Sequence, residues 1–299
     1  MNVKRLIVSL ALVVSLVALL VYILLRSEPV SASRFVEPDR LFQIVEANVR
    51  EQTEFDVIAD IDHARLAAKA GSPMPPAHVL IWSDPELDAA ILQHNPLAAV
   101  DLPLRILAFE DQNTGKAAVI VNSYDYMAQR HSLPDDQRLR ARYTTAITRA
   151  LDGVPEDAIA ALPTDAKLDP GLVTLDSPYD FAATEERIME AINAQSDTVT
   201  FGTVDFTERS KKSGVILQPM RLLLFGGPGP GGRAMKSAPT LGLDAFCQKM
   251  LIWQDDDGGV HVTFNDLLTI AARQQVSGGV ALRLINRRIK ATFAESLTP

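Results

Sequence analysis

Residues 78 to 131 read HVLIWSDPELDAAILQHNPLAAVDLPLRILAFEDQNTGKAAVIVNSYDYMAQRH. The pattern returns at residues 221 to 274 as RLLLFGGPGPGGRAMKSAPTLGLDAFCQKMLIWQDDDGGVHVTFNDLLTIAARQ. The two stretches align without a gap at a shift of 143 positions. Over residues 62 to 131 this shift gives thirteen identities, whereas average composition gives roughly four by chance. The sequence therefore predicts one domain that is used twice.

The identical residues are mostly polar residues, glycines and prolines, which are the residue types that turns and ligand sites require. They pair as Asp62 with Asp205, Lys69 with Lys212, Gly71 with Gly214, Pro76 with Pro219, Leu80 with Leu223, Pro85 with Pro228, Pro96 with Pro239, Asp101 with Asp244, Gly115 with Gly258, Val119 with Val262, Asn122 with Asn265, Ala128 with Ala271 and Arg130 with Arg273.

Composition narrows the classes of function. The chain has 37 acidic and 29 basic residues and a net charge of -8, so it lacks the basic face by which nucleic acid is bound. Cys247 is the only cysteine, so an intrachain disulfide is not possible. Because it lies in an apolar run, we expect a buried, inert thiol.

An uncharged apolar run occupies residues 6–25, which is long enough to cross a hydrocarbon layer of about 30 Å. Lys4 and Arg5 precede it, so the positive-inside rule places residues 1–5 in the cytoplasm. We expect an uncleaved single-pass anchor in the cell inner membrane, a tether at residues 26–38 and the rest of the chain in the periplasm. A signal peptide cleaved after Ala32 is the alternative, although the run is longer than a usual signal peptide core.

The first copy, residues 39–153, predicts a mixture of helices and strands. Helices are expected from Asp39, at residues 63–71 with Gly71 at the end, from Asp84 to His94, at 124–131, and at 135–153 with Asp135 as cap. Strands are expected at 55–62, 78–82, 98–110 and 116–121, with Pro103 marking an edge or a bulge. This order favours an α+β fold with helices packed on a small sheet.

Residues 154–180 carry four prolines and five aspartates, which is typical of a linker. The second copy, residues 181–299, then repeats the opening helix at 185–195, the first strand at 199–206 and the closing helix at 280–297. A single copy would expose an apolar face, so we expect the two copies to pack as an intramolecular pseudo-dimer.

These residues carry a resemblance to a family. FDVIADIDHARLAAKAG, the DLPLR run at residues 101–105 and the pattern N-x-x-x-Y-x-A-x-R-H resemble the bacterial family called domain of unknown function 302, over residues 40–133 and again 183–276. The resemblance implies a compact α+β fold that forms dimers, and it brings no mechanism because the family has no established activity. This chain departs from the family pattern at 83–85 and 226–228, where SDP and GGP replace GNP, and at 244–247, where DAFC replaces DLPL.

Polar residues at repeated or neighbouring positions are the candidates for a ligand site. A charge within an apolar strand needs a partner to offset desolvation. The candidates are Asp101, Arg105, Asn122, Arg130, Asp244, Asn265 and Arg273. In an extended strand Asp101 and Arg105 would lie about 13 Å apart, so a direct ion pair between them is not expected. One interpretation is that Asp101, Asn122 and Arg130 only hold a strand end and a helix start by hydrogen bonds, and the other is a shared ligand pocket.

Other motifs do not predict a cofactor or a metal. The histidines at 63, 78, 94, 131 and 261 lack metal-ligand spacing. The glycine-rich stretch at 226–232 is expected to be a loop without an anion site, because its prolines remove amides that an anion would need.

Two functions remain. The first is a membrane-anchored, non-catalytic module that binds an unknown small molecule or envelope protein through the cleft between its halves. The second is an envelope enzyme that uses Asp101 or Asp244 as an acid or base.

Overall fold

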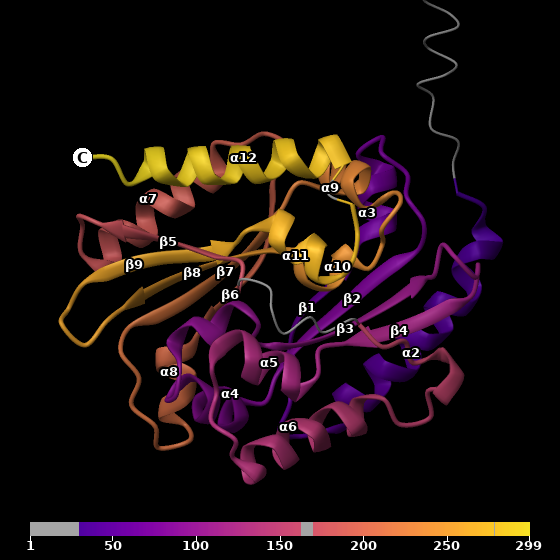
Figure 1. Ribbon diagram of the computed structural model, residues 1–299, viewed down its shortest axis with the longest axis horizontal. Coiled ribbons are helices and arrows are strands. Elements are labelled where there is room, and N and C mark those ends of the chain that lie inside the picture. The colour runs from indigo at the N-terminus through magenta and orange to yellow at the C-terminus, as the bar shows by residue number, and fades with distance from the viewer. Residues whose placement is uncertain (1–29, 163–169, 278) are drawn as a thin grey trace, which may run out of the picture.

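The computed structural model describes residues 30–162, 170–277 and 279–299, which form two antiparallel sheets, one in each repeat (Figure 1). The first sheet has the order β1-β2-β3-β4 and the second has the order β5-β9-β8-β7-β6. The first is built from β1 (Asp56–Asp62), β2 (Ala77–Ser83), β3 (Leu104–Glu110) and β4 (Ala117–Val121). The second is built from β5 (Leu172–Ser177), β6 (Val199–Asp205), β7 (Met220–Gly226), β8 (Gln248–Gln254) and β9 (Val260–Asn265).

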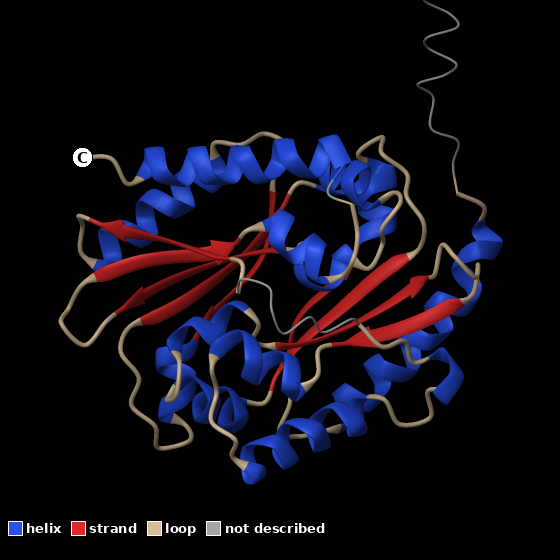
Figure 2. Cartoon of the chain, viewed as in Figure 1, coloured by secondary structure: helices blue, strands red, loops and turns tan. Residues whose placement is uncertain are grey.

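Helices cover the outer face of each sheet (Figure 2). In the first repeat α2 (Val36–Glu51) packs on the strands and on α6 (Gln137–Ala150). In the second repeat α7 (Phe181–Asn193) packs on strand β8 and on α12 (Gly279–Ser296). The remaining elements of the first repeat are η1 (Ala32–Phe35), α3 (His63–Lys69), α4 (Pro85–Leu92), η2 (Pro96–Val100), α5 (Tyr124–His131) and η3 (Glu156–Ala158). Those of the second are α8 (Phe206–Lys211), α9 (Pro228–Met235), α10 (Leu241–Asp244) and α11 (Leu267–Arg273). The predicted α+β class is confirmed.

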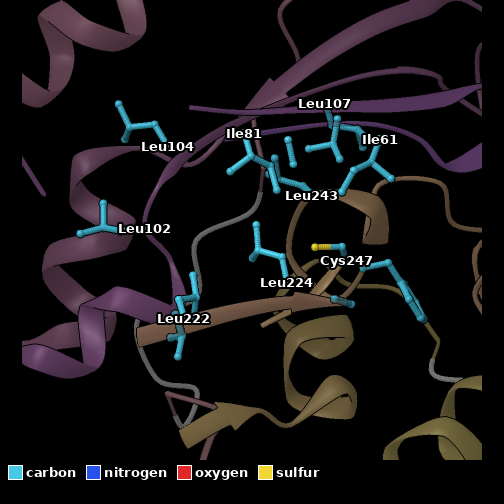
Figure 3. Close-up of a cluster of buried hydrophobic side chains, with 14 of the residues drawn as sticks. Ile61, Ile81, Leu102, Leu104, Leu107, Leu222, Leu224, Leu243 and Cys247 are labelled. Carbon is cyan, nitrogen blue, oxygen red and sulfur yellow. The ribbon is translucent and has the colours of Figure 1, made fainter. Parts of the chain in front are cut away.

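The two repeats pack against each other through reciprocal contacts. Helix α3 packs on α9, while α4 packs on α8, and the shift of 143 turns one pair of helices into the other. Strand β1 also meets β6, its own counterpart, at the centre of the interface. An apolar core lies at this interface, to which Ile61, Ile81 and Leu107 contribute from one repeat and Leu224 and Leu243 from the other (Figure 3). These contacts bury a face that either repeat would expose alone.

Residues 98–110 differ from the predicted continuous strand. Residues 96–100 form η2, the chain then turns, and β3 begins only at Leu104. Pro103 marks neither an edge strand nor a bulge, because it precedes β3 and β3 lies between β2 and β4 inside the sheet. A proline lacks the amide hydrogen that a central strand needs, so the strand starts after it.

The glycine-rich stretch 226–232 is also not the predicted loop. Gly226 ends β7, and Pro228 opens α9 at the first helical turn, where a proline is well tolerated. The glycines permit close packing, since a Cβ on Gly232 would lie 2.5 Å from the Cβ of Ala67 in α3.

The expected linker, residues 154–180, contains a strand. Residues 172–177 form β5 at the edge of the second sheet, paired with β9 from Leu172 opposite Asn265 to Ser177 opposite Val260. The side chains of β5 are partly or fully exposed, so its sequence has no strong apolar alternation to reveal a strand. Backbone pairing with β9 along its whole length supplies what the local sequence lacks.

Two helix starts differ from the prediction. The first helix begins at Val36 inside the expected tether, so Asp39 lies in its first turn and does not cap it. Asp136, one residue beyond the predicted Asp135, caps α6 by accepting from the amides of Arg138 and Leu139. The expected membrane span, residues 6–25, lies outside the described residues. Within the described ranges, each helix is too short or too polar to cross a bilayer.

Candidate functional site

The seven candidate residues meet in one buried cluster at the contact between the repeats. Their exposed fractions lie between 2 and 6 %. The backbone brings them together because Asp101 follows η2 and Asp244 ends α10, both beside the neighbouring repeat. The strands β3 and β9, the helices α5 and α11, and the position after β4 supply the other candidates. We call the following set the central cluster: Asp101, Arg105, Asn122, Tyr126, Arg130, His131, Asp244, Lys249, Asn265, Arg273 and Gln274.

Asp101 accepts three hydrogen bonds from side chains of its own repeat. Its Oδ1 accepts from Nη2 of Arg105 at 2.9 Å, and its Oδ2 accepts from Nη1 of Arg130 at 2.6 Å and from Nε2 of His131 at 2.6 Å. The prediction that Asp101 and Arg105 do not pair is therefore wrong. It assumed an extended strand between them, whereas the chain turns before Leu104 and brings the guanidinium back to the carboxylate.

Asp244 receives donors from both repeats. Its Oδ1 accepts from Arg105 Nη2 at 2.9 Å and from Asn122 Nδ2 at 2.8 Å, and its Oδ2 accepts from Gln274 Nε2 at 3.3 Å. Arg105 thus bridges one aspartate of each repeat. Arg130 makes a second cross-repeat contact, from Nη2 to Oδ1 of Asn265 at 2.5 Å.

Lys249 takes the structural place of Arg105 in the second repeat. Arg105 pairs with Ile81 across the first sheet, and Lys249 pairs with Leu224, the counterpart of Ile81, across the second. The alignment at 143 instead placed Gln248 opposite Arg105, because the segment between Asp244 and β8 holds one more residue than its first-repeat equivalent. The Nζ of Lys249 donates to the backbone oxygen of Asp244 at 2.8 Å.

Burial and neighbouring charge set the protonation of this cluster. Burial alone would raise the pKa of Asp101, but Arg130, His131 and Arg105 outweigh it and hold that pKa well below its usual value. Burial, with the charge of Arg105, lowers the pKa of Lys249 to about 7. Burial also lowers the pKa of His131, which is therefore neutral at pH 7. Asp101 stays ionised at neutral pH and is not a proton carrier.

Sequence reasoning missed Tyr126, His131, Lys249 and Gln274. His131 and Gln274 are related by the shift of 143 and each donates to the aspartate of its own repeat. The two residues are not identical, so the repeat does not single them out, whereas the property that they share is a side-chain N–H donor. Lys249 was hidden by the extra residue.

A second group of ligand-type side chains lies on the surface of the first repeat. Asp39, Asp62 and His78 have oxygen or nitrogen atoms within 4.8 Å of one another, a spacing that could hold a metal ion. Arg65, however, donates to both aspartates, at 2.7 Å to Oδ2 of Asp39. The guanidinium thus offsets one of the two negative charges of this group and occupies both carboxylates.

Comparison with known proteins gives a family and partial relatives. Two proteins named "Fluoride-specific ion channel FluC 1", from Brucella suis biovar 1 (strain 1330) and Brucella abortus biovar 1 (strain 9-941), are each 35% identical over 118 residues. The match covers 39% of this chain and 46% and 43% of those proteins, so the chain spans less than half the length of these relatives.

One solved structure, titled "Crystal structure of uncharacterized conserved protein DUF302 from Bacillus stearothermophilus", is 19% identical and has a TM-score of 0.36. It covers 42% of this chain and 95% of its own. The model of the family described as "Domain of unknown function DUF302" matches residues 31–153 and again residues 173–292. This chain therefore belongs to the DUF302 family and carries two tandem copies of its domain.

Proposed function

We propose that this chain is a non-catalytic binding module of the periplasm, held at the cell inner membrane by residues 6–25. The uncharged run at 6–25 and the preceding Lys4 and Arg5 support the anchor and its orientation. The first element of the folded repeats, η1, begins at Ala32, which is seven positions after Leu25 in the sequence. Such a short connection would keep the repeats close to the membrane surface.

The observation that carries the proposal is that the repeated carboxylates are buried at the contact between the repeats and are occupied by side-chain donors. Asp101 and Asp244 each accept three side-chain hydrogen bonds and are 3 and 2 % exposed. The alternative, an enzyme with Asp101 or Asp244 as acid or base, needs a carboxyl group that reaches substrate and exchanges a proton near neutral pH. The burial of both groups and the low pKa of Asp101 count against it.

An open groove across both repeats is the candidate binding surface. Its volume is about 430 Å³, and its apolar lining comes from Leu92 and Pro96 of the first repeat and from Ile216, Leu217 and Trp253 of the second, beside glutamine and aspartate side chains. Ile216 is 90 % exposed, and an accessible apolar side chain beside a groove is typical of an interaction site. The segment shared with the two proteins named as fluoride channels is about as long as one repeat. Since a channel resides in a membrane, we propose an integral membrane protein as the partner.

The location is tested with the full chain carrying a reporter at its C-terminus. A phosphatase that is active only outside the cytoplasm should be active, a fluorescent protein that matures only inside should be dark, and the chain should resist alkaline extraction from membranes. The reverse pattern of reporters would contradict the orientation, and release by alkali would contradict the anchor.

The binding surface is tested with photocrosslinking side chains placed at Ile216 or at Leu284 in cells. Leu284 is a matched control, because it is an apolar residue of α12 that is 62 % exposed. We expect an adduct of one discrete mass, in the membrane fraction, from position 216 alone. Adducts from both positions, or from neither, would count against the groove as the binding surface.

A further inference from the structure

Arg273 breaks the symmetry of the central cluster. Its counterpart Arg130 donates to Asp101, to Asn265 and to the backbone oxygen of Pro170. Arg273 instead lies over the ring of Tyr126, with its Cζ 3.9 Å from the ring centroid. Within the described residues Arg273 forms no hydrogen bond and no ion pair, and its Nε is buried without a partner.

The missing acceptor has a structural cause. If the repeats were equivalent, Oδ1 of Asn122 would accept from Arg273, as Oδ1 of Asn265 accepts from Arg130. The amide of Asn122 donates its Nδ2 to Asp244, and its Oδ1 has no partner among the residues that the structure describes. The amide oxygen that corresponds to the acceptor of Arg130 therefore does not accept from Arg273.

The charges of the cluster do not balance. Among the residues that the structure describes, Arg105, Arg130 and Arg273 face Asp101 and Asp244 as the acidic members of the cluster, which leaves one positive charge in excess, and Lys249 adds a second when it is protonated. Arg273 is 4 % exposed and Tyr126 is 5 % exposed. An uncompensated charge at such depth costs free energy unless a counter-charge is present.

We propose that Arg273 binds a small monovalent inorganic anion of the halide class at the contact between the repeats. Such an ion supplies the one negative charge that the cluster lacks and accepts from the unpartnered Nε. The low exposure of Arg273 and Tyr126 favours an ion of one or a few atoms over a larger organic ligand, which would have to separate the repeats. This site goes beyond the groove and does not depend on it or on a membrane location.

Anion binding is measured on the purified full-length protein in detergent. The melting temperature is followed while sodium fluoride, chloride or nitrate replaces sodium gluconate at constant ionic strength, and isothermal titration calorimetry measures the heat of binding. Since a ligand that binds only the folded state stabilises it, at least one small anion should raise the melting temperature by about 5 °C near saturation. Equal melting temperatures in all four salts, with no heat of binding, would overturn the proposal.

Two variants locate the site. Arg273→Gln should lose the anion-dependent shift and, because it removes an uncompensated charge, should melt in gluconate no lower than the wild type. Arg273→Lys keeps the charge and should retain a weaker shift. Arg288→Gln is the control, because Arg288 is an exposed arginine paired with Asp197, and its shift should equal that of the wild type. An undiminished shift in Arg273→Gln, or a wild-type shift that Arg288→Gln removes, would overturn the assignment to Arg273.

Discussion

At the scale of single residues, the carboxylate of Asp101 holds two buried arginines, Arg105 and Arg130, in the central cluster. Asp101→Asn keeps the shape but removes the charge that Arg105 and Arg130 require. Breaking a buried ion pair typically costs about 3–5 kcal/mol, so we expect a loss of that size in the free energy of unfolding, measured by urea denaturation.

The control for this variant is Asp197→Asn on the surface, where the aspartate pairs with Arg288. An exposed ion pair contributes about 0–1 kcal/mol, so this variant should be close to the wild type. If both variants lost the same small amount of stability, Asp101 would not be a structural centre of the cluster.

Lys249 makes stability depend on pH at the residue scale. Burial and Arg105 lower its pKa to about 7, whereas an unfolded lysine titrates at about 10.4. Between these values the unfolded chain binds a proton that the folded chain does not, so this group makes stability rise as pH increases from about 7 to about 10. Asp244, Asp101 and Cys247 favour the charged amine but do not outweigh burial.

Lys249→Met should therefore stabilise the protein most below pH 7 and progressively less toward pH 10. The measurement is the melting temperature of both proteins from pH 6 to pH 10, with Lys116→Met as the control because Lys116 is exposed. A difference between Lys249→Met and the wild type that stays constant over this range would show that Lys249 does not titrate in it.

At the scale of elements, helix α9 depends on glycine where it crosses α3. A Cβ on Gly232 would lie 2.5 Å from the Cβ of Ala67 and 2.6 Å from the backbone oxygen of Ser72. We expect Gly232→Ala to lower the free energy of unfolding by about 1–3 kcal/mol, as overpacking does.

Gly229 in the same helix provides the matched control, since its added Cβ would have ordinary contacts of 3.6 Å with Ala70. Gly229→Ala should be neutral or slightly stabilising, because alanine loses less entropy in a helix than glycine by about 0.5–1 kcal/mol. Equal effects of the two substitutions in chemical denaturation would contradict close packing of α9 on α3.

Local signals predicted most elements but not their tertiary partners. Asp84 and Pro85 indicated the start of α4, and the shift of 143 located β6 and β7 at the counterparts of β1 and β2. Strand β5 was missed because an exposed edge strand has little apolar alternation. The start of β3 was missed because a run of apolar residues is common to a strand and to the η2 turn before it.

At the scale of the whole molecule, the two repeats should unfold as one unit. Arg105 contacts Asp101 and Asp244 at 2.9 Å each, so the same side chain joins both repeats. We expect a single calorimetric transition for the wild type, and for Arg105→Met either two resolved transitions or one at a markedly lower temperature.

Arg142→Met is the control for coupling, because Arg142 pairs with Asp84 and Glu86 inside the first repeat. This variant should keep one transition close to that of the wild type. Two transitions in the wild type itself would show that the cluster does not couple the repeats.

The sequence by itself determined that a unit of α+β structure occurs twice, and it identified seven polar residues that meet at the contact between the copies. These results follow from the periodicity of apolar residues along the chain and from the comparison of one copy with the other, neither of which requires the tertiary structure. Only the tertiary structure decided that Arg105 bridges Asp101 and Asp244, that Lys249 occupies the place of Arg105, and that Arg273 has no acceptor in the described part of the chain. The physical reason is that such contacts join residues as far apart as 139 positions, and their geometry depends on turns and strand register that adjacent residues do not specify.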